Sequence, residues 1–103
     1  MELHEINLKL INLPGKIAIT ERLLEMAKVD TRVAEATAMN SASELPSQDL
    51  RKAQIDIDKN VIRARKNEGT LKAEYHGLIN AFQGIQELAR NVRQEMKSLK
   101  DGL

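Results

Sequence analysis

The residues of this 103-residue chain that could carry out chemistry begin with its two histidines, His4 and His76. Neither histidine stands in a His-Glu-x-x-His or Glu-x-x-His motif, the spacings that bring metal ligands to one face of a helix. We therefore predict no metal site, and we expect His76 to be an ordinary exposed side chain beside a helical seam.

Charged pairs one helical turn apart are a second type of candidate. Glu21 and Glu25 have this spacing, as do Lys52 and Asp56. Two carboxylates on one helix need acidic groups from a second element to hold Mg²⁺, and no acidic partner helix accompanies this pair. We interpret the charged pairs as solvated helix surface.

The remaining possibilities for catalysis are weak. Ser41, Ser43 and Ser47 lie in a small, polar segment with no neighbouring His or Lys base, so helix capping explains them better than nucleophilic catalysis. The sequence Pro14-Gly15-Lys16 is too short for a phosphate-binding loop. There is no cysteine, which excludes disulfides, thiolate metal sites and a Cys nucleophile. We predict that the chain is not an enzyme and has no cofactor.

Basic residues are the only candidates for ligand binding that the composition suggests. Residues 51–72 hold seven basic and three acidic side chains, although the whole chain carries a net charge of only +1. The possible nucleic-acid contacts are Arg51, Lys52, Lys59, Arg63, Arg65 and Lys66, with Lys72 beside them. A second basic stretch contains Arg90, Arg93, Lys97 and Lys100. No aromatic residues are interleaved for base stacking, so a solvated surface partly neutralised by the acidic residues 1–50 is the competing interpretation.

A heptad pattern is the strongest signal in the sequence. Apolar residues follow 4-3 spacing from Leu50 onward, with Gln54 and Glu68 as the two exceptions. The pattern comprises Leu50, Ile57, Val61, Ala64, Leu71, Tyr75, Leu78, Phe82, Ile85, Ala89, Val92, Met96, Leu99 and Leu103. It predicts one long helix over residues 48–100, with Ser47 as its N-cap.

The segment around Gly69 leaves an alternative open. Gly69 could end one helix and Thr70 could cap the next, which would give a compact three-helix bundle. The heptad phase is unchanged across this segment and no proline interrupts it, which favours a continuous helix.

The first part of the chain has its own seam. It contains Leu3, Ile6, Leu10, Leu13, Ile17, Thr20, Leu24, Ala27, Thr31, Ala34 and Ala38. A proline inside a helix costs about 3 kcal/mol, so Pro14 predicts a short helix over residues 2–12 and a second over 14–40. A loop over 41–47 follows. The prediction is a single all-α domain, a helical hairpin with a long C-terminal helix that assembles into a coiled coil or bundle.

The end of the long helix carries the predicted assembly surface. A helix of 14–40 folded back would cover only about residues 48–75, leaving the later part of the seam without an intrachain partner. The predicted oligomer or partner interface is Leu78, Phe82, Ile85, Ala89, Val92, Met96 and Leu99. Gly77, Ala81 and Gly84 share one face, which predicts close packing of another helix. A dimer or tetramer is the expected assembly.

Two further features of the sequence predict where in the cell the protein is located. No apolar run approaches the roughly 20 residues of a membrane span, and the first residues lack the basic and apolar regions of a signal peptide. We therefore expect a cytoplasmic protein without membrane partners.

The segment from Ala73 to Arg90 resembles the tail of small helical accessory proteins of phages and prophages. The resemblance covers these 18 residues and includes no diagnostic motif. It implies a partner among host or phage proteins, or an accessory role in DNA transactions.

Three functions follow from these patterns. The first is a non-enzymatic protein-interaction module, acting as an inhibitor or adaptor through a helical bundle. The second is a nucleic-acid accessory protein for replication or recombination that uses the basic residues of 51–72. The third is an assembly chaperone of a larger particle.

Overall fold

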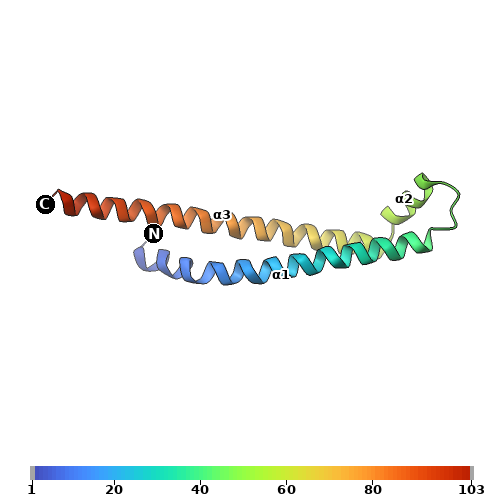
Figure 1. Cartoon of the computed structure of the whole chain (residues 1–103), viewed down its shortest axis with the longest axis horizontal. Helices are drawn as coiled ribbons and strands as arrows, with labels where there is room; N and C mark the ends of the chain where they lie inside the picture. Colours follow the sequence, from blue (N-terminus) through green and yellow to red (C-terminus); the bar gives the residue numbers. More distant parts are fainter. Residues whose placement is uncertain (1, 103) are drawn as a thin grey trace.

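The protein is a helical hairpin, described by a computed structural model over residues 2–102. Its helices are α1 (Leu3–Ser41), α2 (Gln48–Asp56) and α3 (Lys59–Asp101). In Figure 1, α1 and α3 run antiparallel side by side, the short α2 closes one end, and the C-terminal part of α3 extends past α1. The predicted all-α hairpin with a long C-terminal helix is confirmed.

Helix α1 is continuous through Pro14, so the predicted break between residues 12 and 14 is wrong. A proline removes one backbone hydrogen bond from a helix. Before this position, however, Leu10 and Leu13 pack on the hydrophobic cluster that contains Ile85 and Ala89 of α3, and after it Thr20 and Leu24 are buried. Packing of an apolar face contributes more to helix stability in a protein than local propensity does, and here it holds the two segments in one helix.

The long helix predicted for residues 48–100 is interrupted between Asp56 and Lys59, and not at Gly69. Asp58 accepts hydrogen bonds from the backbone N–H groups of Asn60 and Val61, at 2.9 and 3.1 Å, and so begins α3 as its N-cap. Helix α2 ends at Asp56, after beginning at the predicted cap Ser47. The predicted continuity from 48 to 58 is therefore wrong.

Helix α3 runs through Gly69 without interruption, as the unchanged heptad phase predicts. The alternative of a three-helix bundle with a turn at Gly69 is therefore wrong.

The two predicted seams face each other, and they form the core. One cluster joins Ile6 of α1 to Ile85 and Ala89 of α3. A second cluster, at the α2 end, joins Ala38, Ile55 and Val61. The predicted seam fails around α2, where Leu50 and Ile57 are 52% and 65% exposed and Ile55 is buried instead, because the break before α3 changes the helical phase.

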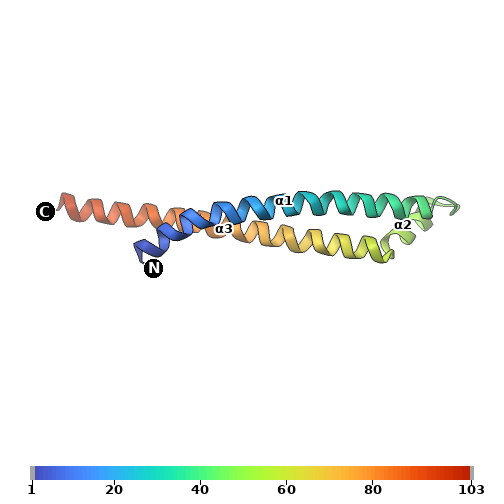
Figure 2. The same ribbon diagram turned by 90° about the horizontal axis from the view of Figure 1, so that it is seen from below.

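Because α1 is one helix of 39 residues, it covers far more of α3 than predicted. Its Ile6, near the N-terminus, reaches Ile85 and Ala89, and Val92 packs against the same cluster. The prediction that the seam from Phe82 onward lacks an intrachain partner is thus wrong up to Val92. Beyond it, Met96 and Leu99 are exposed in the part of α3 that extends past α1 (Figure 2).

The molecule is long and thin, which limits how much it can bury. It measures 80 × 21 × 15 Å, with a radius of gyration of 22.5 Å, whereas a compact domain of this length has about 13 Å. Two helices side by side shield only the stripe between them, and their other faces stay in contact with solvent. No helix within residues 2–102 is long and apolar enough to cross a membrane.

Candidate interaction surface

Helix α1 has a second apolar face, on the side turned away from α3. We call it the outer face. Its large side chains are between 44% and 73% exposed. They are Leu8, Ile11, Ile19, Leu23, Met26, Val29 and Val33.

The spacing of five of these residues places them opposite the seam, whereas Ile11 and Leu23 are each next to a seam residue in the sequence and lie at the flanks. Leu8, Ile19 and Met26 each follow a seam residue (Ile6, Ile17 and Leu24) by two positions. Two residues correspond to about 200° of rotation in an α-helix with 3.6 residues per turn. Val29 and Val33 follow their seam residues in the same way. Helix α1 is therefore apolar on two opposite sides, and α3 covers only one of them.

The exposed apolar residues are unevenly distributed over the molecule. Fourteen large hydrophobic side chains are exposed among the described residues, and nine of them belong to α1. Single exposed apolar residues are normal on protein surfaces, whereas a contiguous apolar patch marks an interaction site. The outer face extends from Leu8 to Val33, about 38 Å along the helix at 1.5 Å per residue.

The residues predicted as an oligomer or partner interface lie mostly in the hairpin itself. Ile85 and Ala89 are buried against α1, and Leu78, Phe82 and Val92 are half-buried. Met96 and Leu99 are the exposed members, at 55% and 73%. Five of the seven predicted interface residues thus belong to the intrachain seam.

The small residues predicted for close helix packing make no such contact within the chain. Gly77, Ala81 and Gly84 are exposed, and a Cβ atom added at either glycine would meet no atom within 4 Å. Ala81 and Gly84 instead line an open groove of about 420 Å³, with Leu8 and Leu13 on its α1 side. The groove adjoins the N-terminal end of the outer face.

Two of the six basic residues predicted to contact nucleic acid are engaged within the chain. The Arg65 guanidinium donates to Asp56 of α2 at 3.0 Å and lies 3.5 Å from Glu35 of α1, so it joins all three helices. The pKa of Arg65 is raised, mainly by the hydrogen bond to Asp56. Arg51 donates to the carbonyl oxygen of Leu45 at 2.8 Å, which anchors the loop before α2. The remaining candidates are exposed, namely Lys52, Lys59, Arg63 and Lys66.

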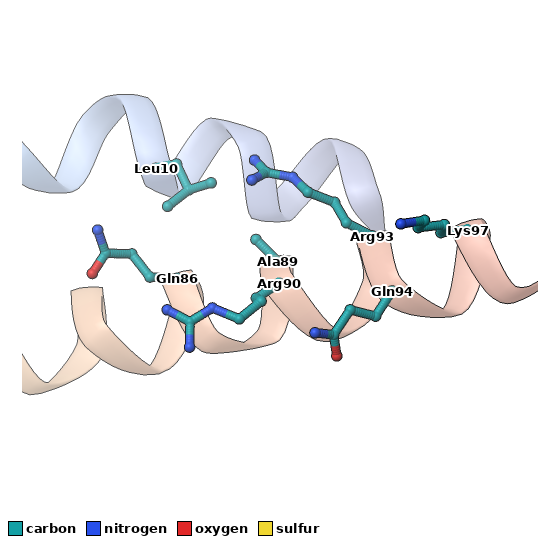
Figure 3. Close-up of a pocket in the computed structure, with 7 residues that line it drawn as sticks. All are labelled: Leu10, Gln86, Ala89, Arg90, Arg93, Gln94 and Lys97. Carbon is teal, nitrogen blue, oxygen red and sulfur yellow. The ribbon is translucent and has the colours of Figure 1, made fainter.

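A second basic surface lies near the opposite end of the hairpin. Arg90, Arg93 and Lys97 line an open groove of about 450 Å³ on one side of α3 (Figure 3). The amide side chains Gln86 and Gln94 lie beside them. No carboxylate of residues 2–102 lies within salt-bridge distance of the three cations. This groove offers unneutralised positive charge to an anionic ligand.

The histidines and the carboxylates lie apart. His4 and His76 are both exposed, and the imidazole ring of His76 neighbours only the Tyr75 ring, at a centroid distance of 5.8 Å. Within residues 2–102, no group of three or more His, Asp or Glu side chains could hold a metal ion.

Comparisons of the chain with protein-family models, with curated proteins and with solved structures each find no match.

Sequence reasoning missed the outer face, although the sequence contains a signal for it. Ile19, Met26, Val29 and Val33 follow 7-3-4 spacing, which is as helical as the seam itself. A single apolar stripe on α1 accounts for the seam and leaves these residues unexplained on the solvent side. Two offset apolar stripes on one helix indicate a helix with packed neighbours on both sides.

Proposed function

We propose that the chain is a cytosolic, non-enzymatic protein-interaction module that acts by packing helix against helix. The outer face of α1 is its docking surface. The observation that carries this proposal is the presence of two opposite apolar faces on α1, of which α3 covers one.

The outer face is large enough to support an association. Complete burial of one Val, Leu, Ile or Met side chain contributes roughly 1.5–3 kcal/mol. Its seven side chains are about half exposed, so burying the rest contributes on the order of 5–10 kcal/mol per copy of the face. Association costs an estimated 4–15 kcal/mol. One such face against a complementary apolar helix is therefore of the right size for a specific complex.

The thin shape of the hairpin supports the same function. Among the described residues, only five buried apolar side chains are larger than alanine, against fourteen large exposed ones. Adding a helix to the outer face would turn α1 into the central helix of a layer and would supply the core that two helices lack.

Site-specific photocrosslinking in the cells that make the protein tests this proposal whatever the identity of the partner. A benzophenone amino acid placed at Ile19 or Met26 is expected to capture a protein in high yield. Asn80 is the matched control, because it is exposed on α3 and lies two positions from the seam residues Leu78 and Phe82. Equal capture from Asn80 and from the outer face, or none from either, would refute the docking surface.

Phosphate binding is the second candidate function, and the uncompensated groove of Arg90, Arg93 and Lys97 favours it. Retention of double-stranded DNA is expected to weaken with salt, and the double variant Arg90→Gln with Arg93→Gln should lower the salt slope by about 1 per arginine removed. Arg32→Gln with Lys72→Gln makes the same change in net charge at exposed positions outside this groove and serves as the control. Absence of retention at low salt would exclude this function.

A further inference from the structure

We propose that the occupant of the outer face is a second copy of this chain, with the two α1 helices antiparallel and centred between Thr20 and Glu21. This inference rests on the proposed function and names the partner of that same surface. The arrangement places α1 against α1 in the middle and an α3 on each outer side, so that every neighbouring pair of helices is antiparallel.

In this orientation, small residues lie opposite large ones at two levels of the outer face, while Ile11 lies opposite Asp30 and Val29 opposite Asn12. With the centre at Thr20 and Glu21, Leu8 of one copy lies opposite Val33 of the other. Gly15 lies opposite Met26, and large side chains pack best against small ones at facing positions. An added Cβ at Gly15 would meet nothing within 4 Å in the hairpin, so the space above this glycine is open.

The same alternation recurs nearer the centre. Ala18 of one copy lies opposite Leu23 of the other, and both residues are exposed in the hairpin. A parallel, in-register pair would instead place Gly15 against Gly15 and Met26 against Met26. That arrangement leaves a gap at one level and crowding at another, which a close-packed interface disfavours.

Charge favours the antiparallel pair as well. The first half of α1, residues 3–20, carries Lys9 and Lys16 against the single acid Glu5. The second half, residues 21–41, carries four acidic and three basic side chains. Antiparallel pairing sets these opposite net charges side by side and places Lys16 level with Glu25 of the other copy, while Lys9 lies level with Arg32.

The position of Arg22 also favours the antiparallel pair. Arg22 follows the seam residue Thr20 by two positions, so it belongs to the outer face. In a parallel, in-register pair the two Arg22 side chains would meet directly. In the antiparallel pair, Arg22 lies opposite Ile19, and its aliphatic stem can cover that side chain while the guanidinium reaches water.

Disulfide trapping tests both the identity of the partner and the orientation, because the chain has no cysteine of its own. Leu8→Cys and Val33→Cys are each prepared as single variants, both at exposed positions. Each is oxidised alone and after refolding together with the other, and retained helicity shows that the hairpin is intact. In the antiparallel pair, two Leu8 positions are about 37 Å apart along the axis, and a disulfide needs Cα atoms within about 7 Å.

The expected result is a disulfide-linked dimer in the mixed sample and none in either single variant. Ala18→Cys mixed with Leu23→Cys should form the same product, as a second register point. A linked dimer of Leu8→Cys alone would overturn the antiparallel arrangement and leave the docking surface intact. No linked dimer in any sample would overturn the second copy as occupant; photocrosslinking from Ile19 to a different protein would then show that the proposed function still holds.

Discussion

Replacing Ile85 by Asp is expected to unfold the hairpin. Ile85 is only 9% exposed and packs with Ile6 and Ala89 in the cluster that holds the N-terminal end of α1 on α3. Truncation of a buried Ile to Ala typically costs about 2–5 kcal/mol, and a carboxylate without a partner adds its own desolvation penalty. A single domain of ordinary size has about 5–15 kcal/mol of stability in total, and this thin hairpin buries less than most.

Circular dichroism during thermal unfolding measures this effect. The Ile85→Asp variant should lose most of its helical signal at about 25 °C, the temperature to which these stabilities refer. Gln83→Asp is the control, since it introduces the same residue at an exposed position of the same helix, two residues away. If both variants melt alike, the cost comes from helix propensity, and the cluster at Ile85 contributes little to the fold.

The helical seams could be predicted from the sequence because their determinants are local and periodic. The 3-4 spacing from Ile6 to Ala38 and from Val61 to Val92 survives in the structure as the buried stripe between α1 and α3. Continuity through Gly69 also follows from unchanged phase, because a turn would have had no reason to preserve it.

The breaks were harder to predict, since each depends on a balance between local and distant forces. Pro14 carries a local penalty, but the helix packs on both sides of it, through Leu10 and Leu13 before it and the buried Leu24 after it. Asp58 is the opposite case, because one capping carboxylate begins α3 within an otherwise helical pattern. Propensity scales describe the residue alone, and neither outcome is a property of the residue alone.

The interaction surface could be predicted only in part. The sequence predicts surplus apolar surface and self-association, but it assigns that surface to α3 because Pro14 is expected to shorten its partner. Once α1 is continuous, it covers α3 as far as Val92, and the surplus lies on the outer face of α1 instead. The length of one helix thus decides which face of the hairpin is left open.

Placing two glutamates on the outer face, through Met26→Glu with Val33→Glu, is expected to separate the copies while preserving the hairpin. Both positions are more than half exposed in the single chain, at 57% and 59%. Their substitution therefore leaves the seam intact, and glutamate is a good helix former. At the interface, the two copies would bury four carboxylates opposite Leu8 and Gly15, which offer no partner for the charge, and a complex cannot tolerate this. Glu74→Gln with Glu87→Gln on α3 provides a control that changes charge away from this face.

The molar mass of the protein in solution tests the central claim most directly, namely that a second copy covers the outer face of α1. Light scattering on the purified wild-type chain should give twice the 11.6 kDa of one chain, and the double-glutamate variant should give a single chain with unchanged helicity. A wild-type mass of 11.6 kDa at every concentration, or a dimer that the double variant leaves intact, would contradict it.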